Sequence, residues 1–223
     1  MLHLPPAGLR PLLALLALAA GPASAQAGRY TVAGTNPVGG GTYGGTVTVS
    51  RQGEAFRVVW LTGGDPVEGI GVVVNDVLAV AYGGAGAPGA CGVVAYNTAG
   101  DDGFEAVWAT MGGTALGTEA ARPEPAPAQA GGDVYRVTGT NPGSGTLYSG
   151  TLAMAETDGG TLVRWSVGGR DYDGLGLSVD DVLGIAYGDQ TCGVAVYRID
   201  GDALDGVWTT PGAAGVGTEV ARP

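Results

Sequence analysis

The sequence predicts an all-β protein of two tandem domains, each an antiparallel meander of about eight strands, with a small barrel favoured over a sandwich. Residues 30–84 align with residues 135–189 without a gap, and 23 of the 55 aligned pairs are identical. Within each copy, short runs rich in Val, Thr, Tyr and Trp alternate with glycine-rich turn segments. A repeat of about ninety residues is a whole domain, because solenoid and propeller units span only about 20–50 residues.

The first 25 residues have the pattern of an export signal. Arg10 supplies a positive charge, residues 12–20 form a Leu/Ala run, and residues 23–25 form a small-residue cleavage site. The apolar run is shorter than the ~20 residues that cross a bilayer, and no later segment is a candidate span. We therefore expect a signal peptide over residues 1–25, a first β-domain over 28–123, a Pro/Ala linker over 124–131 and a second β-domain over 132–223, in a secreted or periplasmic product.

Alternation and turn residues place the strands of each copy. In the first copy we expect them at residues 30–36, 43–51, 55–61, 68–74, 77–83, 91–98, 104–110 and 117–121. Val58 and Trp60 share one face of the third strand, opposite Arg57, so this strand should bury one face only. Asn75 and Asp76 separate two apolar runs, which predicts a two-residue hairpin. Successive hairpins give a meander, and eight strands can close into a barrel without free edges.

The inner face of this barrel should be aromatic. Bulky residues predicted to point inward include Leu78, Val80, Tyr82, Phe104 and the four tryptophans Trp60, Trp108, Trp165 and Trp208, which we expect to anchor the core. Side chains of this size can fill the lumen of a small barrel. The alternative is an aromatic cup at one open end, since ligand sites often lie in barrel mouths.

The charge of the chain excludes several functions. Beyond the predicted leader, nine arginines stand against twenty-one acidic residues, a formal net charge of −12, with no lysine and no histidine. Such a chain is unsuited to nucleic acid or anionic lipid. Ser–His–Asp and Cys–His catalysis, Schiff-base chemistry and His-ligated metals are unavailable without these side chains. We therefore predict a protein that is not an enzyme, with no cofactor and no metal site.

Carboxylates are the remaining catalytic groups, because glycoside hydrolysis needs two of them. Both copies carry acidic residues at four positions: Glu68/Asp173, Asp76/Asp181, Glu105/Asp205 and Glu119/Glu219. Turn positions and outward faces explain the second and third pairs. Glu119 and Glu219 each precede an arginine by three residues, within ion-pair reach. Glu68 and Asp173 share strand parity with apolar residues, and a carboxylate on such a face needs a partner, so they are the candidate ligand-binding residues.

Cys91 and Cys192 occupy the same position in the two copies. In an oxidising compartment they could form a disulfide between the domains, which requires Cα atoms within ~7 Å. The alternative is two separately buried thiols that act as small apolar residues. The sequence leaves both alternatives open.

A set of motifs common to both copies resembles a protein family. The motifs Tyr-x-Val-x-Gly-Thr-Asn-Pro, Val-Leu-x-x-Ala-Tyr and Gly-Thr-Glu resemble small secreted bacterial proteins labelled fibronectin-binding, over residues 30–122 and 135–222. Those proteins generally carry one copy, and the resemblance implies extracellular adhesion without naming site residues.

We therefore expect a binding or adhesion protein for an extracellular protein or glycan, with two copies that raise avidity. The alternatives are a carbohydrate-active enzyme that uses acidic residues and a structural envelope protein. The oligomeric state does not follow from the sequence.

Overall fold

The computed structural model describes residues 27–37, 39–83, 87, 89–100, 102–125 and 132–223. The predicted leader and residues 126–131 of the predicted linker lie outside this part of the chain. The described residues form strands and turns without a helix, so they offer no helical segment long and apolar enough to cross a membrane. The strands of the first copy are β1 (Gly28–Thr35), β2 (Thr42–Gln52), β3 (Ala55–Leu61), β4 (Val67–Val74), β5 (Val77–Tyr82), β6 (Cys91–Asn97), β7 (Phe104–Thr110) and β8 (Gly117–Glu124). Those of the second copy are β9 (Asp133–Thr140), β10 (Leu147–Thr157), β11 (Gly160–Val167), β12 (Arg170–Val179), β13 (Val182–Gly188), β14 (Gly193–Asp200), β15 (Ala203–Thr209) and β16 (Gly217–Arg222).

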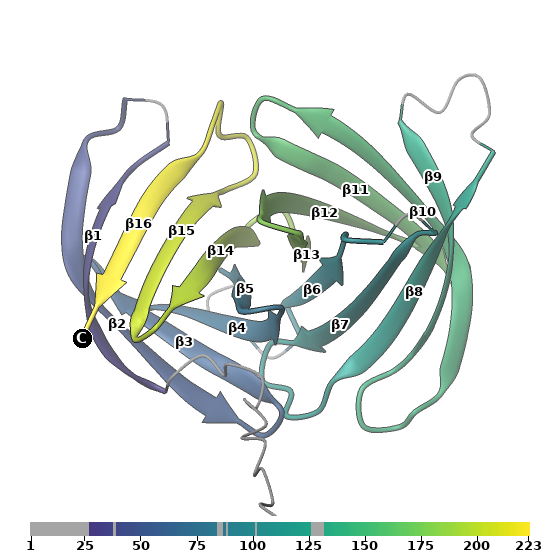
Figure 1. Cartoon of the computed structure of the whole chain (residues 1–223), viewed down its shortest axis with the longest axis horizontal. Coiled ribbons are helices and arrows are strands. Elements are labelled where there is room, and N and C mark those ends of the chain that lie inside the picture. Colours follow the sequence, from purple (N-terminus) through teal and green to yellow (C-terminus); the bar gives the residue numbers. More distant parts are fainter. Residues whose placement is uncertain (1–26, 38, 84–86, 88, 101, 126–131) are drawn as a thin grey trace, which may run out of the picture.

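The strands close into two antiparallel barrels of eight strands each. We call β1–β5 with β14–β16 the first barrel, and β6–β13 the second barrel. Figure 1 shows the two barrels side by side, and they meet at β5 and β14 of the first barrel and β6 and β13 of the second. The all-β fold and the choice of barrel over sandwich are confirmed.

Neither barrel is built from one sequence copy. The chain leaves the first barrel after β5 and returns to it at β14, so β5 pairs with β14 and β13 pairs with β6. The expectation that residues 28–123 and 132–223 each close a barrel of their own is therefore wrong. Because the copies are equivalent, β14 offers β5 the same pairing that β6 would offer. The last three strands of the copies are exchanged, as in a domain swap within one chain.

The two chain crossings are joined covalently. Cys91 is the first residue of β6 and Cys192 directly precedes β14. Their sulfur atoms are 2.08 Å apart and their Cα atoms 5.7 Å apart, so the structure has the disulfide and not two separate thiols. The bridge fixes the two barrels to one another where the chain passes between them.

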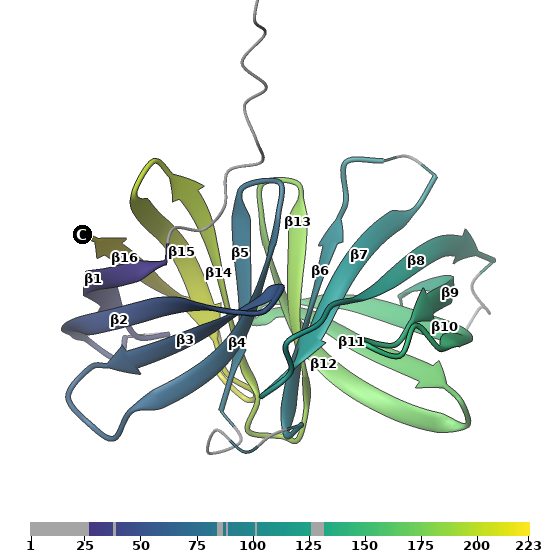
Figure 2. The same cartoon turned by 90° about the horizontal axis from the view of Figure 1, so that it is seen from below.

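The described residues form three apolar cores: one in each lumen and one between the barrels. The alternation along β5 shows how they arise. Leu78 and Val80 point into the lumen of the first barrel, whereas Ala79 and Ala81 pack against the second barrel. The central strands are therefore buried on both faces, which a period of two alone does not predict. Figure 2 shows β5 beside β13 in this central layer.

The predicted hairpin between β4 and β5 is confirmed, because Asn75 and Asp76 both have positive φ, at 47° and 60°. Such turns match the twist of the two flanking strands. The predicted linker begins later than expected: Glu124 is the last residue of β8 and pairs with Val134 of β9. The linker thus joins two neighbouring strands of the second barrel.

The four tryptophans divide into two classes. Trp60 and Trp165 lie deep in the lumens, 7% and 6% exposed, as expected of core anchors. Trp108 and Trp208 pack against the same lumen clusters but are only half-buried. These two line the barrel ends, so the expectation of four core anchors is correct for only two of them.

Candidate functional site

One end of the first barrel holds a buried carboxylate among aromatic side chains. Glu219 of β16 is 3% exposed. Its Oε1 accepts hydrogen bonds from the Trp60 indole at 2.9 Å and the Tyr197 hydroxyl at 2.7 Å. Its Oε2 accepts one from the Tyr43 hydroxyl at 2.7 Å. Three neutral donors therefore hold the carboxylate, which satisfies much of its hydrogen-bonding capacity without supplying a positive charge.

The second barrel repeats this arrangement with equivalent residues. Glu119 of β8 is 5% exposed and accepts hydrogen bonds from the Tyr148 hydroxyl at 2.8 Å and the Trp165 indole at 3.0 Å. The Tyr96 hydroxyl also donates to Glu119. In both barrels the glutamate comes from one copy and two of its donors come from the other.

The ion pairs expected for these glutamates are wrong. Residues three apart on a strand point to opposite faces, so Glu219 points inward while Arg222 points outward. Arg222 pairs instead with Asp205 at 2.9 Å, and Arg122 pairs with Glu105. The alternation along the strand could have identified both glutamates as buried, because every second residue of β8 and β16 around the glutamate is buried.

Aromatic rings surround Glu219. Tyr43 and Trp208 meet edge to face with ring centroids 6.0 Å apart, and Tyr82 lies 5.8 Å from Trp60 and 6.5 Å from Trp208. Glycines opposite these rings explain part of the high glycine content. A Cβ on Gly34 would collide with the Tyr43 ring. Glycine in a strand thus leaves room for a neighbouring side chain to lie against the barrel wall.

Burial keeps the tyrosine hydroxyls of this cluster protonated. Burial first, and then the hydrogen bond to Glu219, raise the pKa of Tyr43 far above its usual value. Burial also raises the pKa of Tyr197 well above its usual value, with the nearby charge of Glu219 adding to the effect. Both hydroxyls therefore remain hydrogen-bond donors to the carboxylate at physiological pH.

This end of the first barrel contains a pocket of about 310 Å³. It is lined by Asn36, Tyr43, Trp60, Thr62, Val67, Tyr82, Ala195, Tyr197, Trp208 and Glu219. Among the described residues of this lining, Glu219 alone carries a charge. The pocket thus combines aromatic walls with a negative charge, which is the aromatic cup that the sequence left as an alternative to a filled lumen.

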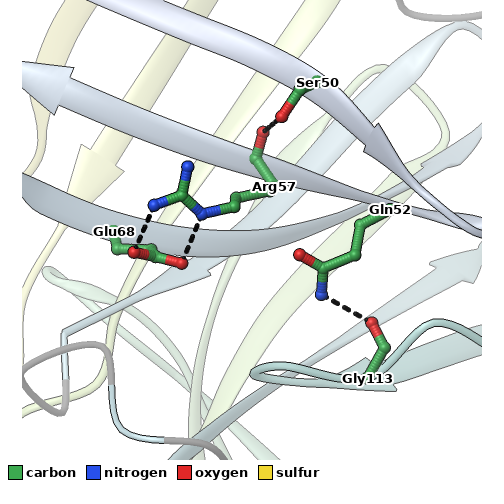
Figure 3. A network of polar contacts seen from close by, with 5 residues as sticks. All are labelled: Ser50, Gln52, Arg57, Glu68 and Gly113. Carbon is green, nitrogen blue, oxygen red and sulfur yellow. Dashed lines mark hydrogen bonds and ion pairs between the residues drawn. The ribbon is translucent and has the colours of Figure 1, made fainter.

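The residues predicted to bind a ligand lie elsewhere. Glu68 and Asp173 are on the outer faces of β4 and β12, and each receives two hydrogen bonds from an arginine of the adjacent strand. Figure 3 shows the Arg57–Glu68 pair, with N–O distances of 2.6 and 2.7 Å. The partner that the sequence analysis expected for each of these two carboxylates is therefore an arginine of the neighbouring strand.

Strand parity explains why these two positions looked unusual. Ile70 shares the outer face with Glu68, but it lies where the other barrel covers that face. Asp173 also lines a groove of about 670 Å³ beside the loop between β15 and β16. A ligand-binding role of Glu68 and Asp173 stays a prediction.

The geometry of the pocket is suited to holding a ligand by stacking and charge. Comparisons with protein-family models, with curated proteins and with solved structures found no match.

Proposed function

We propose that this chain is a secreted or periplasmic binding protein whose first barrel holds a small ligand in the pocket above Glu219. One observation carries the proposal: a concave site with aromatic walls and few polar groups, at the end of a barrel. Ligand sites in proteins have this composition, and their volumes begin at about 300 Å³. Export is supported by the composition of residues 1–25.

The same site does not favour the alternative of a carbohydrate-active enzyme. Glycosidases use two carboxyl groups that flank the scissile bond, about 5–10 Å apart. The pocket lining contains a single carboxylate, and its oxygens already accept three hydrogen bonds. Binding is therefore the function that this geometry supports better than hydrolysis.

Adhesion to a matrix protein or glycan fits the proposal if the bound group is a small part of a larger partner. A pocket of this size accepts one side chain or one sugar unit and not a flat protein surface. Glu119 in the second barrel repeats the carboxylate network, but Tyr172 and Val94 replace Val67 and Ala195 there. The proposal therefore places the ligand in the first barrel, without the avidity of two sites.

The test is a ligand screen that reports on the pocket. We would measure the melting temperature of the full chain with panels of sugars, amino acids, organic cations and organic anions. A ligand at 100 times its Kd stabilises the folded state by about 2.7 kcal/mol, which gives a measurable shift. We expect at least one class to stabilise the protein and the effect to disappear in Trp208→Ala.

The matched control is Trp108→Ala, which changes the equivalent tryptophan of the second barrel and should preserve the shift. The proposal is wrong if no class binds, or if binding survives Trp208→Ala. Release of reducing sugar from a glycan panel would show an enzyme instead of a binding protein.

A further inference from the structure

The pocket of the first barrel has an uncompensated negative charge at its base. Glu219 is almost fully buried, its three partners are neutral, and Arg222 of the same strand is directed outward to Asp205. Burying a charge is costly unless another charge or a dense set of dipoles accompanies it. In this low-dielectric surrounding, the carboxylate attracts a cation more strongly than it would in water.

The walls of the pocket also favour a positively charged ligand. Tyr43, Trp60, Tyr82 and Trp208 all line it. The faces of Tyr and Trp rings carry negative electrostatic potential, and they bind cations placed within about 6 Å of the ring centre. The carboxylate and the rings therefore select for a positively charged ligand by two independent effects.

Hydrogen-bonding capacity separates one kind of cation from another. Glu219 already accepts three hydrogen bonds, and much of the remaining lining consists of the aromatic side chains named above. A primary ammonium brings three N–H donors that need acceptors when they leave water. An ammonium whose hydrogens are replaced by methyl groups has no such need and is stabilised by aromatic faces alone.

From these observations, and resting on the proposed function of this same pocket, we infer that the first barrel binds a methylated ammonium group. Choline has this chemistry as a free molecule, and phosphatidylcholine presents it as a lipid headgroup.

The experiment compares three probes on the full chain by isothermal titration calorimetry. Choline carries the methylated ammonium, 3,3-dimethylbutan-1-ol has the same shape without the charge, and tetramethylammonium is the methylated ammonium alone. We expect choline to bind at least about tenfold more tightly than the neutral alcohol. We expect tetramethylammonium to bind within about tenfold of choline, because the charged methylated group is what the aromatic walls recognise.

Three variants locate the binding. Glu219→Gln should weaken choline binding at least about tenfold, with Glu119→Gln as the matched control that makes the same change in the second barrel. Trp208→Ala removes one of the four rings and should also weaken choline binding. Val67→Tyr should block the pocket without touching the Glu219 hydrogen bonds, which keeps the test decisive if Glu219→Gln does not fold.

The outcomes separate this inference from the proposed function. Equal affinity for choline and 3,3-dimethylbutan-1-ol, or unchanged choline binding in Val67→Tyr, would overturn the inference and leave a neutral-ligand protein. Absence of binding by all three probes, with sugars or anions binding instead, would overturn it as well. Sedimentation with phosphatidylcholine vesicles but not phosphatidylglycerol vesicles would identify the lipid headgroup as the source, whereas choline binding without sedimentation would identify a free ligand.

Discussion

The two barrels share one carboxylate network but differ at the ends where it lies. The donors to Glu219 and Glu119 are of the same types at equivalent positions. The residues around them are not. Val67 and Ala195 line the pocket of the first barrel, whereas the equivalent residues of the second barrel are Tyr172 and Val94. Tyr172 adds a ring against Tyr187, with centroids 6.5 Å apart.

This difference separates two roles: holding the carboxylate and setting access to it. The residues that hold the carboxylate are the same in both barrels, whereas those that set access to it are larger in the second barrel. We therefore expect the first barrel to be the better ligand site and the network of the second barrel to serve its core.

The largest expected effect concerns how the barrels are joined. If the chain is cut within residues 126–131, the halves should stay together, because each barrel contains strands of both copies. Size-exclusion chromatography of the cut and reduced protein should show one particle of the original size. A denaturing gel should show two fragments only after reduction. Separation of the halves without denaturant would mean that the strands are not exchanged.

Replacing a tryptophan of the lumen by alanine should have the next largest effect on stability. The effect should be equal in the two barrels. Trp60→Ala and Trp165→Ala remove deeply buried rings that donate to Glu219 and Glu119, so each should lower the free energy of unfolding by about 3–5 kcal/mol. Trp108→Ala and Trp208→Ala remove half-buried rings and should cost less. Urea denaturation measures all four. A cost for Trp108→Ala as large as that for Trp165→Ala would contradict the distinction between core and barrel end.

The disulfide between the barrels should contribute as much to the free energy of unfolding as one core tryptophan, or less. Cys91 and Cys192 are 101 residues apart in sequence, so their bridge restricts the unfolded chain strongly. Replacing both by Ala should lower the free energy of unfolding by about 2–4 kcal/mol while the β-sheet circular dichroism spectrum is retained. An unchanged denaturation midpoint relative to the wild type would show that the apolar core between the barrels suffices.

Exchanging the residues at the barrel ends tests the comparison directly. Tyr172→Val with Val94→Ala gives the second barrel the smaller residues of the first. If access alone prevents binding there, calorimetry should then find two choline sites per chain in place of one. The unchanged chain serves as the control. A stoichiometry of two before the substitution would show that Tyr172 does not restrict access.

The smallest effect is expected on the outer wall. Arg57 donates two hydrogen bonds to Glu68, and this interaction lowers the pKa of the carboxyl group. Both side chains are partly exposed to solvent, so Glu68→Gln should change the free energy of unfolding by less than about 1 kcal/mol at neutral pH. A lowered folded-state pKa stabilises the protein above the unfolded-state pKa, and the contribution is lost as pH falls through the folded-state value.

Urea titrations at neutral and at strongly acidic pH measure this effect. The wild type and Glu68→Gln should differ only at neutral pH, and Asp173→Asn in the second barrel should follow the same pattern. A large loss at neutral pH would give Glu68 a role beyond its ion pair.

Local patterns were sufficient for much of the architecture. Turn residues such as Asn75 and Asp76 placed a hairpin, because few residues tolerate positive φ. Alternation placed Trp60 and Val80 in a lumen, because side chains of a strand alternate between faces. The same alternation applied to Glu219 would have placed it inside the barrel. Spacing along the chain alone suggests an ion pair between Glu219 and Arg222, but strand parity puts the two side chains on opposite faces.

The sequence by itself determined the two copies, their strands, and the residue types that gather around each glutamate. Which copy completes which barrel was decided only by tertiary structure, because equivalent strands offer the same pairing and the same local energy. That decision matters for function. Without exchange, Val67 would share a barrel with Val94, and Tyr172 would share one with Ala195. Strand exchange instead brings the two smaller residues to one barrel end and the two larger ones to the other, and so gives the first barrel the more open pocket.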